Sequence, residues 1–288
     1  MIPGEFDYQR PGDLGTVLRV LKEREGEAKV LAGGHSLLPL LKFRLAAPAV
    51  LLDLRGITGL DAITDTGDGV RIGALATHRQ ILESPVTGRY PLLRETAAGI
   101  GDPQVRNWGT IGGSCAHADP NSDWPAVLLA LNGVLVCRSA DGEREVGARD
   151  FFLDVFTTAI EPAELLTEIR LPRRPAGGGG AYRKLERRAG DFATVGVAVR
   201  LVIADGVISD AGVGVTAVPS PMAATDAEAA LLGSAPTEET FAAAADAAAA
   251  QSEPVSDSHG PADYKRAMVR EMTLRALRAA HERAAANA

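Results

Sequence analysis

A glycine pair between an apolar run and a proline-containing run is the feature that most constrains this chain. It lies in Lys29-Val-Leu-Ala-Gly-Gly-His-Ser-Leu-Leu-Pro39, whose order predicts a strand, a tight turn and then a helix. Gly33 and Gly34 can adopt positive φ, so successive backbone N–H groups can form a nest for an anion. Ser36 suits the helix N-cap, and Pro39 is tolerated because it falls in the first turn. The stretch predicts either a phosphate site or an ordinary strand-to-helix turn.

A second glycine pair favours the phosphate interpretation. Thr110-Ile-Gly-Gly-Ser114 again places glycines beside hydroxyl residues, and two nests can hold one pyrophosphate from two sides. Neither stretch is a P-loop, because no Lys-Ser or Lys-Thr follows the glycines, and neither has the spacing of a Rossmann turn. Gly212-x-Gly214-x-x-Ala217 matches that turn nominally, but it lies in a predicted hairpin strand and runs into Pro219, so we reject it. We therefore expect a nucleotide held by another fold.

Composition restricts the class of protein. The chain has 288 residues, of which 46% are apolar and 23% are charged, which is enough for two or three modest domains. Its formal net charge of −7 argues against a nucleic-acid surface, which needs clustered Lys and Arg. The first residues do not resemble a secretory signal, and charged residues interrupt the longest apolar region, 37–54. We expect a cytoplasmic protein.

The cysteines and histidines do not indicate a metal site. Cys115 and Cys137 are the only cysteines and form no Cys-x-x-Cys, so this chain alone cannot ligate an iron–sulfur cluster or a thiolate zinc. The five histidines show no metal-binding spacing, and we expect His78 at the surface. Asp119 and Asp123 could form a carboxylate pair for acid–base chemistry, but a helix cap is the favoured role for Asp119.

Apolar periodicity and turn residues predict an α+β chain whose first domain spans 1–173. Two units, 1–55 and 56–173, each combine strands with helices. Asp13 and Thr77 are the expected caps of helices in the first and second unit.

A boundary is expected at 174–180, because four glycines after two prolines cannot sustain a helix or strand. Residues 181–288 then form a smaller domain. Asp205-Gly206 predicts a two-residue hairpin turn between two of its strands. Its helices are expected at 226–232, 238–251 and 264–283.

With both glycine pairs placed, the chain resembles the flavin-binding medium subunits of the molybdenum hydroxylases, most closely those of aerobic carbon monoxide dehydrogenases. The resemblance covers nearly the whole length. It implies two α/β subdomains of the vanillyl-alcohol-oxidase (PCMH) type, followed by a small C-terminal domain of antiparallel strands plus helices. The stretches that carry it are Ala32–Pro39, Val105–Ser114, His117–Pro120 with Ser122-Asp123, Glu164–Thr167, and Lys184 with Gly190–Phe192.

The resemblance implies a non-covalently bound FAD and the residues that hold it. The two glycine stretches supply donors to the diphosphate, while Asp123, Leu166 and Lys184 lie along the flavin and the rest of the dinucleotide. Phe192 stands where relatives often place a tyrosine against the isoalloxazine, so the ring contact is kept and the hydroxyl is lost. The full expected set is Leu31, Ala32, Gly33, Gly34, His35, Ser36, Leu37, Thr110, Ile111, Gly112, Gly113, Ser114, Asp123, Leu166, Lys184 and Phe192.

The resemblance also implies partners. A flavin can pass electrons singly or in pairs, and a chain without cluster ligands must receive them from elsewhere. In the family, a small subunit carries two [2Fe-2S] clusters and a large subunit carries the molybdenum cofactor, assembled as a dimer of heterotrimers. We expect this chain to relay electrons through FAD to a quinone or similar acceptor, with a peripheral contact at the cytoplasmic face of the membrane. Carbon monoxide, oxidised with water to carbon dioxide, is the expected substrate.

Three alternatives stay open. The first is a medium subunit of another molybdenum hydroxylase, acting on a purine, nicotine or an aldehyde. The second is a self-contained oxidase with covalently bound FAD, because His35 lies in the kind of glycine-rich loop that can carry such a bond. The third is a non-catalytic nucleotide-binding regulatory module.

Overall fold

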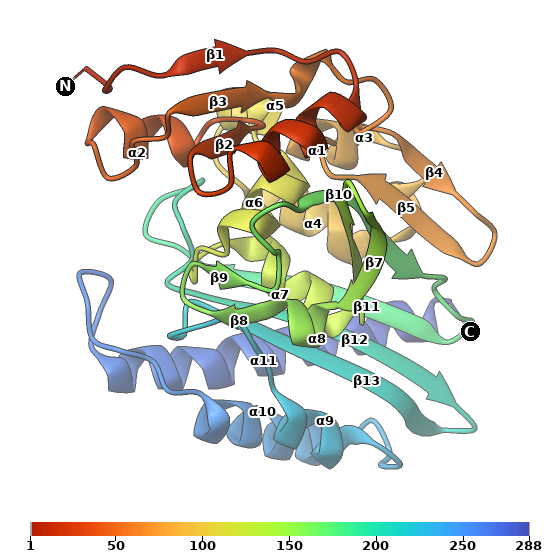
Figure 1. Ribbon diagram of the computed structural model, residues 1–288. Helices are drawn as coiled ribbons and strands as arrows, with labels where there is room; N and C mark the ends of the chain where they lie inside the picture. Colours follow the sequence, from red (N-terminus) through yellow and green to blue (C-terminus); the bar gives the residue numbers. More distant parts are fainter. Residues whose placement is uncertain (1, 288) are drawn as a thin grey trace.

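A three-stranded parallel sheet, in the order β1-β3-β2, opens the fold (Figure 1). The computed structural model describes residues 2–287, so Met1 and Ala288, the outer ends of the two predicted domains, lie outside the described range. Helix α1 packs on the sheet through one apolar cluster and α2 through another. The expected cap of α1 is confirmed, since the Asp13 carboxylate accepts a hydrogen bond from the Thr16 N–H at 2.8 Å. The elements are β1 (Asp7–Gln9), α1 (Leu14–Glu23), β2 (Ala28–Leu31), α2 (Leu37–Lys42) and β3 (Val50–Asp53).

The second unit is built on an antiparallel five-stranded sheet, in the order β4-β5-β10-β6-β7. Thr77 caps α3 in a capping box with Gln80, as its position before the helix predicted. The elements are β4 (Ile63–Asp65), β5 (Gly69–Gly73), α3 (His78–Glu83), α4 (Pro91–Gly99), α5 (Pro103–Trp108), α6 (Ile111–His117), α7 (Asp123–Ala130), β6 (Val134–Ser139), β7 (Gly142–Gly147), α8 (Ala148–Phe151), β8 (Phe152–Asp154), β9 (Thr157–Thr158) and β10 (Leu165–Pro172).

The C-terminal domain is an antiparallel sheet, in the order β11-β12-β13-β14, with three helices against it (Figure 1). The predicted hairpin is confirmed, since Asp205 and Gly206 both have positive φ, of 52° and 77°. Across residues 2–287, no helix is both long and apolar enough to span a membrane. The elements are β11 (Gly178–Leu185), β12 (Val195–Ala204), β13 (Val207–Thr216), β14 (Met222–Ala223), α9 (Thr225–Leu231), α10 (Glu238–Gln251) and α11 (Ala262–Ala285).

The glycine run at the domain boundary is part of a strand, so the expectation that it could form no strand is wrong. Gly178, Gly179 and Gly180 begin β11 and pair with β12. A Cβ on Gly179 would lie 2.0 Å from the carbonyl oxygen of Ala280 in α11. The glycine lets the helix backbone touch the strand, a benefit that outweighs the low strand propensity of the residue.

Helix α7 lies between the two domains, and all eight of its residues are buried. It packs on β13, where Gly212 and Gly214 face its backbone. A Cβ on either glycine would lie 2.0 Å from the carbonyl oxygen of Ala130 or Ala126, respectively. The rejection of this stretch as a dinucleotide turn is confirmed, because both glycines lie inside a strand and serve helix packing.

Ion pairs join the domains at the outer side of α4. The half-buried carboxylate of Glu95 accepts hydrogen bonds from Arg183 of β11 at 3.0 Å and from Arg283 of α11 at 2.8 Å. The backbone N–H of Tyr182 donates to the same carboxylate at 3.0 Å. These donors lower the pKa of Glu95 despite the opposing effect of burial, so the group stays ionised at neutral pH.

We expect Gly214→Ala to lower the free energy of unfolding by about 1–3 kcal/mol, because the new methyl group overpacks the contact with α7. Urea denaturation of both proteins measures the difference. Gly12→Ala is the control, since a Cβ there meets no atom within 4 Å, and it should change stability by less than about 0.5 kcal/mol. Equal stability of the Gly214→Ala protein and the parent would contradict the packing argument.

Candidate functional site

The first glycine stretch forms a loop with unused backbone donors. β2 ends at Leu31, and Gly34 then adopts a positive φ of 79° before α2 begins. Within residues 2–287, the N–H groups of Gly33, Gly34, His35 and Ser36 donate no hydrogen bond. Ser36 is the N-cap residue of α2, as expected, although its hydroxyl accepts no capping hydrogen bond. Adjacent free donors of this kind suit an anion.

The second glycine stretch differs from a free nest, because it is the first turn of α6. Thr110 is the N-cap and accepts from the Gly113 N–H at 3.0 Å. The N–H groups of Ile111 and Gly112 donate to the carbonyls of Ala76 and Ala74, and that of Ser114 donates to Thr110. The backbone donors are therefore engaged inside the protein. The hydroxyl groups of Thr110 and Ser114 are the groups left to contact a ligand.

The two glycine stretches pack against each other although they are far apart in the sequence. A Cβ on Gly33 would lie 2.3 Å from the carbonyl oxygen of Trp108 and 2.9 Å from Cα of Gly109. A Cβ on Gly113 would lie 3.7 Å from Cβ of Ala32. Only a residue without a side chain at position 33 allows this approach. The structure thus brings together the two stretches that were expected to share one ligand.

His78 is buried beneath this contact, so its expected surface position is wrong. Its Nδ1 accepts a hydrogen bond from Trp124 Nε1 at 3.1 Å, and its backbone N–H donates to the Gly109 carbonyl at 3.0 Å. Burial, with smaller contributions from the charges of His35 and Arg106, lowers the pKa of His78 to about 3. The imidazole is therefore neutral and supports the second glycine stretch from below.

A buried polar cluster joins the two domains at the start of α7. Asp123, the first residue of that helix, accepts from the Tyr182 hydroxyl at 2.5 Å and from Lys184 Nζ at 3.3 Å. Lys184 also donates to the Gly99 carbonyl at 3.1 Å and lies 3.3 Å from Glu186. Burial raises the pKa of Asp123, and the ammonium and hydroxyl groups oppose that rise only in part. Two of the expected site residues, Asp123 and Lys184, are thus in direct contact.

Tyr182 and Glu186 were not expected at this site. Burial, and then the charge of Asp123, raise the pKa of Tyr182 well above its usual value, so its hydroxyl stays a donor. Glu186 Oε2 is buried, and its partner is the ammonium of Lys184 at 3.3 Å. The sequence could have indicated both residues. Alternate residues of a strand share one face, and Tyr182 and Glu186 each stand two positions from Lys184.

Leu166 and Phe192 lie in different parts of the fold, one in a buried strand and the other in an exposed loop. Leu166 is buried in β10, and the next residue, Thr167, accepts from the N–H of Ala74, whose carbonyl accepts from Gly112. Phe192 is 55% exposed in the loop between β11 and β12. The N–H that follows it donates to the Asn121 carbonyl at 3.3 Å, which places this loop beside the turn before Asp123.

Asp119 lies in that turn and does not cap a helix, so the capping role expected for it is wrong. Its carboxylate accepts from the Asn121 N–H at 2.9 Å and closes a local turn, while α7 begins after Ser122. No group of three or more His, Cys, Asp or Glu side chains in residues 2–287 could hold a metal ion. The groups that the site presents are the free N–H donors of the loop after β2 and the buried ammonium of Lys184.

Comparison with known proteins decides the family. Residues 4–174 match the FAD binding domain in molybdopterin dehydrogenase, and residues 180–280 match the CO dehydrogenase flavoprotein C-terminal domain. The chain belongs to this molybdenum-hydroxylase flavoprotein family. The arrangement of antiparallel strands and helices after the FAD-binding domain agrees with the expected fold class.

Relatives in this flavoprotein family match over nearly their whole length. The carbon monoxide dehydrogenase medium chain of Hydrogenophaga pseudoflava is 43% identical over 287 residues, which is 99% of this chain and 100% of that protein. The nicotine 6-hydroxylase medium subunit of Paenarthrobacter nicotinovorans is 39% identical over 94% of this chain and 95% of its own length. A solved structure of carbon monoxide dehydrogenase from Hydrogenophaga pseudoflava matches with a TM-score of 0.96 at 46% identity, over 98% of this chain and 99% of that one.

The buried neutral His78 predicts acid sensitivity. Its folded pKa of about 3 lies below the unfolded value of 6.5, so its contribution to stability is complete above the unfolded pKa and is lost as pH falls. Between about pH 7 and about pH 5, the parent should lose roughly 2 kcal/mol more unfolding free energy than His78→Gln, which keeps a polar side chain that does not titrate. Urea denaturation at both pH values tests this. Identical pH losses in the two proteins would refute it.

Proposed function

We propose that this chain is the FAD-carrying medium subunit of a carbon monoxide dehydrogenase. It receives electrons from the [2Fe-2S] clusters of a partner subunit and passes them through FAD to an external acceptor such as a quinone. The oxidation of carbon monoxide with water to carbon dioxide takes place at the molybdenum centre of the large subunit. The observation that carries this proposal is the 43% identity to a carbon monoxide dehydrogenase medium chain over the full length of both proteins.

The residues around the two glycine stretches fit a dinucleotide. The unused N–H groups of the loop after β2, with the free Ser36 hydroxyl, suit the negative charge of a diphosphate. The hydroxyl groups of Thr110 and Ser114 face the same ligand from the second stretch. We assign the diphosphate to these two stretches, which comprise Leu31, Ala32, Gly33, Gly34, His35, Ser36, Leu37, Thr110, Ile111, Gly112, Gly113 and Ser114.

The polar cluster at the domain junction fits the rest of the cofactor. FAD, when bound, accepts and releases electrons, and the protein residues bind and orient it. Lys184 is held by Asp123, Glu186 and a backbone carbonyl, so its ammonium is fixed before any ligand arrives. We assign Asp123 and Lys184, with Leu166 and Phe192, to the flavin and its ribityl and adenine portions.

Exposed aromatic side chains next to the glycine stretches support the docking of a partner there. Trp108 is 53% exposed beside Gly33, and Phe156 and Phe192 are each 55% exposed. The Phe156 N–H donates to the Ala118 carbonyl, and its ring lies 5.0 Å from that of His117, which places it at the C-terminal end of the helix that the second stretch begins. Aromatic residues are enriched in protein interfaces. We place the [2Fe-2S] subunit on this surface, within a dimer of heterotrimers whose acceptor is reached at the membrane face.

Another molybdenum hydroxylase is the second candidate, and the 39% identity to a nicotine 6-hydroxylase medium subunit is the observation that favours it. In both candidates this chain binds FAD and passes electrons from the partner subunit to an acceptor. They differ in the large subunit, where the substrate binds.

We expect the purified chain to retain FAD that acid releases, and Gly33→Ala to weaken FAD binding at least about tenfold. The added Cβ would collide with the Trp108 carbonyl and separate the two stretches. Titration of the apoprotein with FAD, followed by flavin fluorescence, measures the affinity, and circular dichroism checks folding. Gly12→Ala should bind FAD like the parent. Unchanged affinity in folded Gly33→Ala would sink the assignment, and flavin that acid cannot release would favour the covalent oxidase.

We expect carbon monoxide to bleach the flavin band of the complete complex and to leave that of the isolated flavoprotein unchanged. The reason is that this chain provides no cluster ligands and depends on a partner for electrons. Anaerobic absorbance spectra of both preparations, with nicotine added in a parallel sample, provide the test. Bleaching of the isolated chain would overturn the relay, whereas bleaching of the complex by nicotine alone would favour the second candidate.

A further inference from the structure

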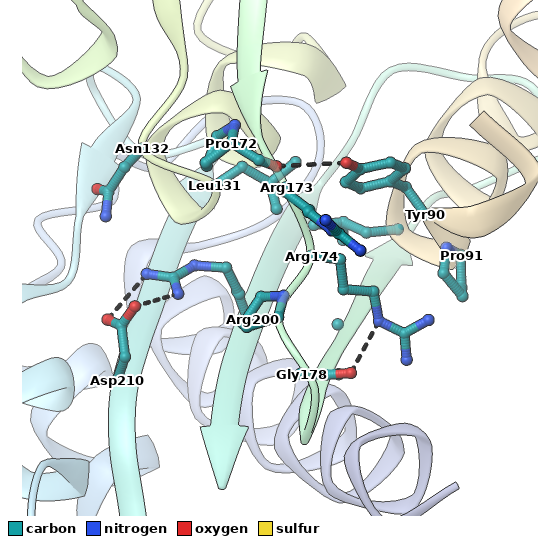
Figure 2. A pocket seen from close by; sticks show the side chains of 14 residues that line it. Tyr90, Pro91, Leu131, Asn132, Pro172, Arg173, Arg174, Gly178, Arg200 and Asp210 are labelled. Carbon is teal, nitrogen blue, oxygen red and sulfur yellow. Dashed lines mark hydrogen bonds and ion pairs between the residues drawn. The ribbon is translucent and has the colours of Figure 1, made fainter. Parts of the chain in front are cut away.

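A cavity of about 350 Å³ opens at the junction of the two domains (Figure 2). The start of α4, the end of α7, the segment Pro172–Pro175 and the first residues of β11 form its walls. Arg200 of β12 and Asp210 of β13 close the side opposite Tyr90. A volume of this size suits a small organic ligand.

The walls are mainly apolar. Leu92, Leu131, Pro91 and Pro172 present hydrocarbon surface to the cavity, and the Tyr90 ring adds an aromatic face. The Tyr90 hydroxyl donates to the Pro172 carbonyl at 3.4 Å, which directs the polar end of that ring toward the protein. Such a surface favours a ligand with an apolar body.

Two guanidinium groups in this cavity have no carboxylate partner among the described residues. Arg174 donates only to backbone carbonyls, those of Gly178 at 2.8 Å, Arg283 at 3.1 Å and Arg89 at 3.4 Å. Arg173 is exposed and reaches only the Gly67 carbonyl, at 3.5 Å. Burial, and then the charge of the nearby Arg283, lower the pKa of Arg174.

The other charged side chains around the cavity do not neutralise the positive charge of Arg173 and Arg174. Asp210 is the one carboxylate in the lining, and it is paired with Arg200 at 3.0 Å. A second, more polar hollow adjoins the first and shares Tyr90, Arg173 and Arg174 with it. Its carboxylate, Asp65, is ion-paired with Arg89, and the charge of Arg173 also lowers the pKa of Asp65. The arginine pair therefore forms a positive ridge between two hollows, in a chain whose formal net charge is −7.

We propose that this cavity binds a small organic anion, a carboxylate carried on an apolar ring or short chain. The apolar body packs against Leu92 and Leu131, and the carboxylate accepts hydrogen bonds from Arg173 and Arg174. Guanidinium groups recognise carboxylates by paired, charge-assisted hydrogen bonds, and an anion here would neutralise the uncompensated charge.

This site is separate from the site assigned to FAD. Both touch β11, but Gly180 lines the cavity and Lys184 belongs to the polar cluster. Four residues of strand span roughly 13 Å. None of the residues that we assign to FAD lines the cavity, so we treat its ligand as a second molecule whose binding does not depend on the proposed function.

Calorimetric titration of the purified full-length chain tests this proposal. The probe is naphthoate, with naphthamide as its uncharged analogue and acetate as the anion without an apolar body. Naphthoate should bind at least about tenfold more tightly than either analogue, because only naphthoate satisfies both the walls and the arginines. Addition of salt should weaken its binding.

Four variants locate the site. Arg174→Met and Arg173→Met should weaken naphthoate binding about tenfold and about threefold, since Arg173 is the more exposed of the two. Asp210→Asn releases Arg200 and should tighten binding about threefold. Arg266→Met is the matched control, because Arg266 lies seventeen positions before Arg283 on α11, roughly 25 Å along the helix. It should leave the affinity unchanged.

Equal affinity for naphthoate and naphthamide, or no saturable naphthoate binding at millimolar concentration, overturns the proposal. An Arg266→Met protein that is weakened as much as Arg174→Met also overturns it, since the effect would then reflect general surface charge. Should Arg174→Met fail to fold, Arg173→Met and Asp210→Asn decide the question. Opposite shifts in their affinities support the site, and unchanged affinity in both removes it.

Discussion

The complete burial of α7 between the two domains is the constraint on which the rest of the structure depends. Its carbonyl groups contact β13 directly, which is possible only because Gly212 and Gly214 have no side chains. Its first residues then have fixed positions. Asp123 meets Lys184 of the C-terminal domain, and Trp124 holds His78 beneath the second glycine stretch. Packing between domains therefore sets the geometry of the candidate site, and a shift of this helix would move every polar group there.

Electrostatics follow from that packing. An ammonium group as buried as that of Lys184 needs partners, because moving an unpaired charge out of water costs several kcal/mol. Asp123, Glu186 and the Gly99 carbonyl supply them from three segments. The Glu95 network, one turn earlier on α4, is more exposed, and it joins the same domains. Together the two networks hold the domain junction in one arrangement before a ligand binds, as a preformed cofactor site requires.

The proposed role in an electron-transfer complex agrees with the groups that the candidate site presents. Backbone amides of one loop and hydroxyl groups of another suit an anionic cofactor, whereas the described residues hold no cluster of metal-ligating side chains. The described residues thus offer hydrogen-bond donors to an anionic redox cofactor. Exposed aromatic rings beside the glycine stretches offer an apolar surface close to that group. A partner subunit docked on this surface would bring its redox group close to the cofactor of this chain.

The sequence by itself determined the local features and the family. The local features depend only on neighbouring residues: the helix caps Asp13 and Thr77, the hairpin turn Asp205-Gly206, and the two glycine stretches. The motifs of the flavoprotein family are likewise continuous stretches of chain. Only the tertiary structure decided which glycine stretch keeps its N–H groups free, because their partners, such as Ala74, are distant in sequence. It also decided that His78 is buried, that Asp123 meets Lys184, and that the boundary glycines form a strand. Those outcomes depend on backbones and side chains brought together by folding, and no local pattern encodes which distant atoms will meet.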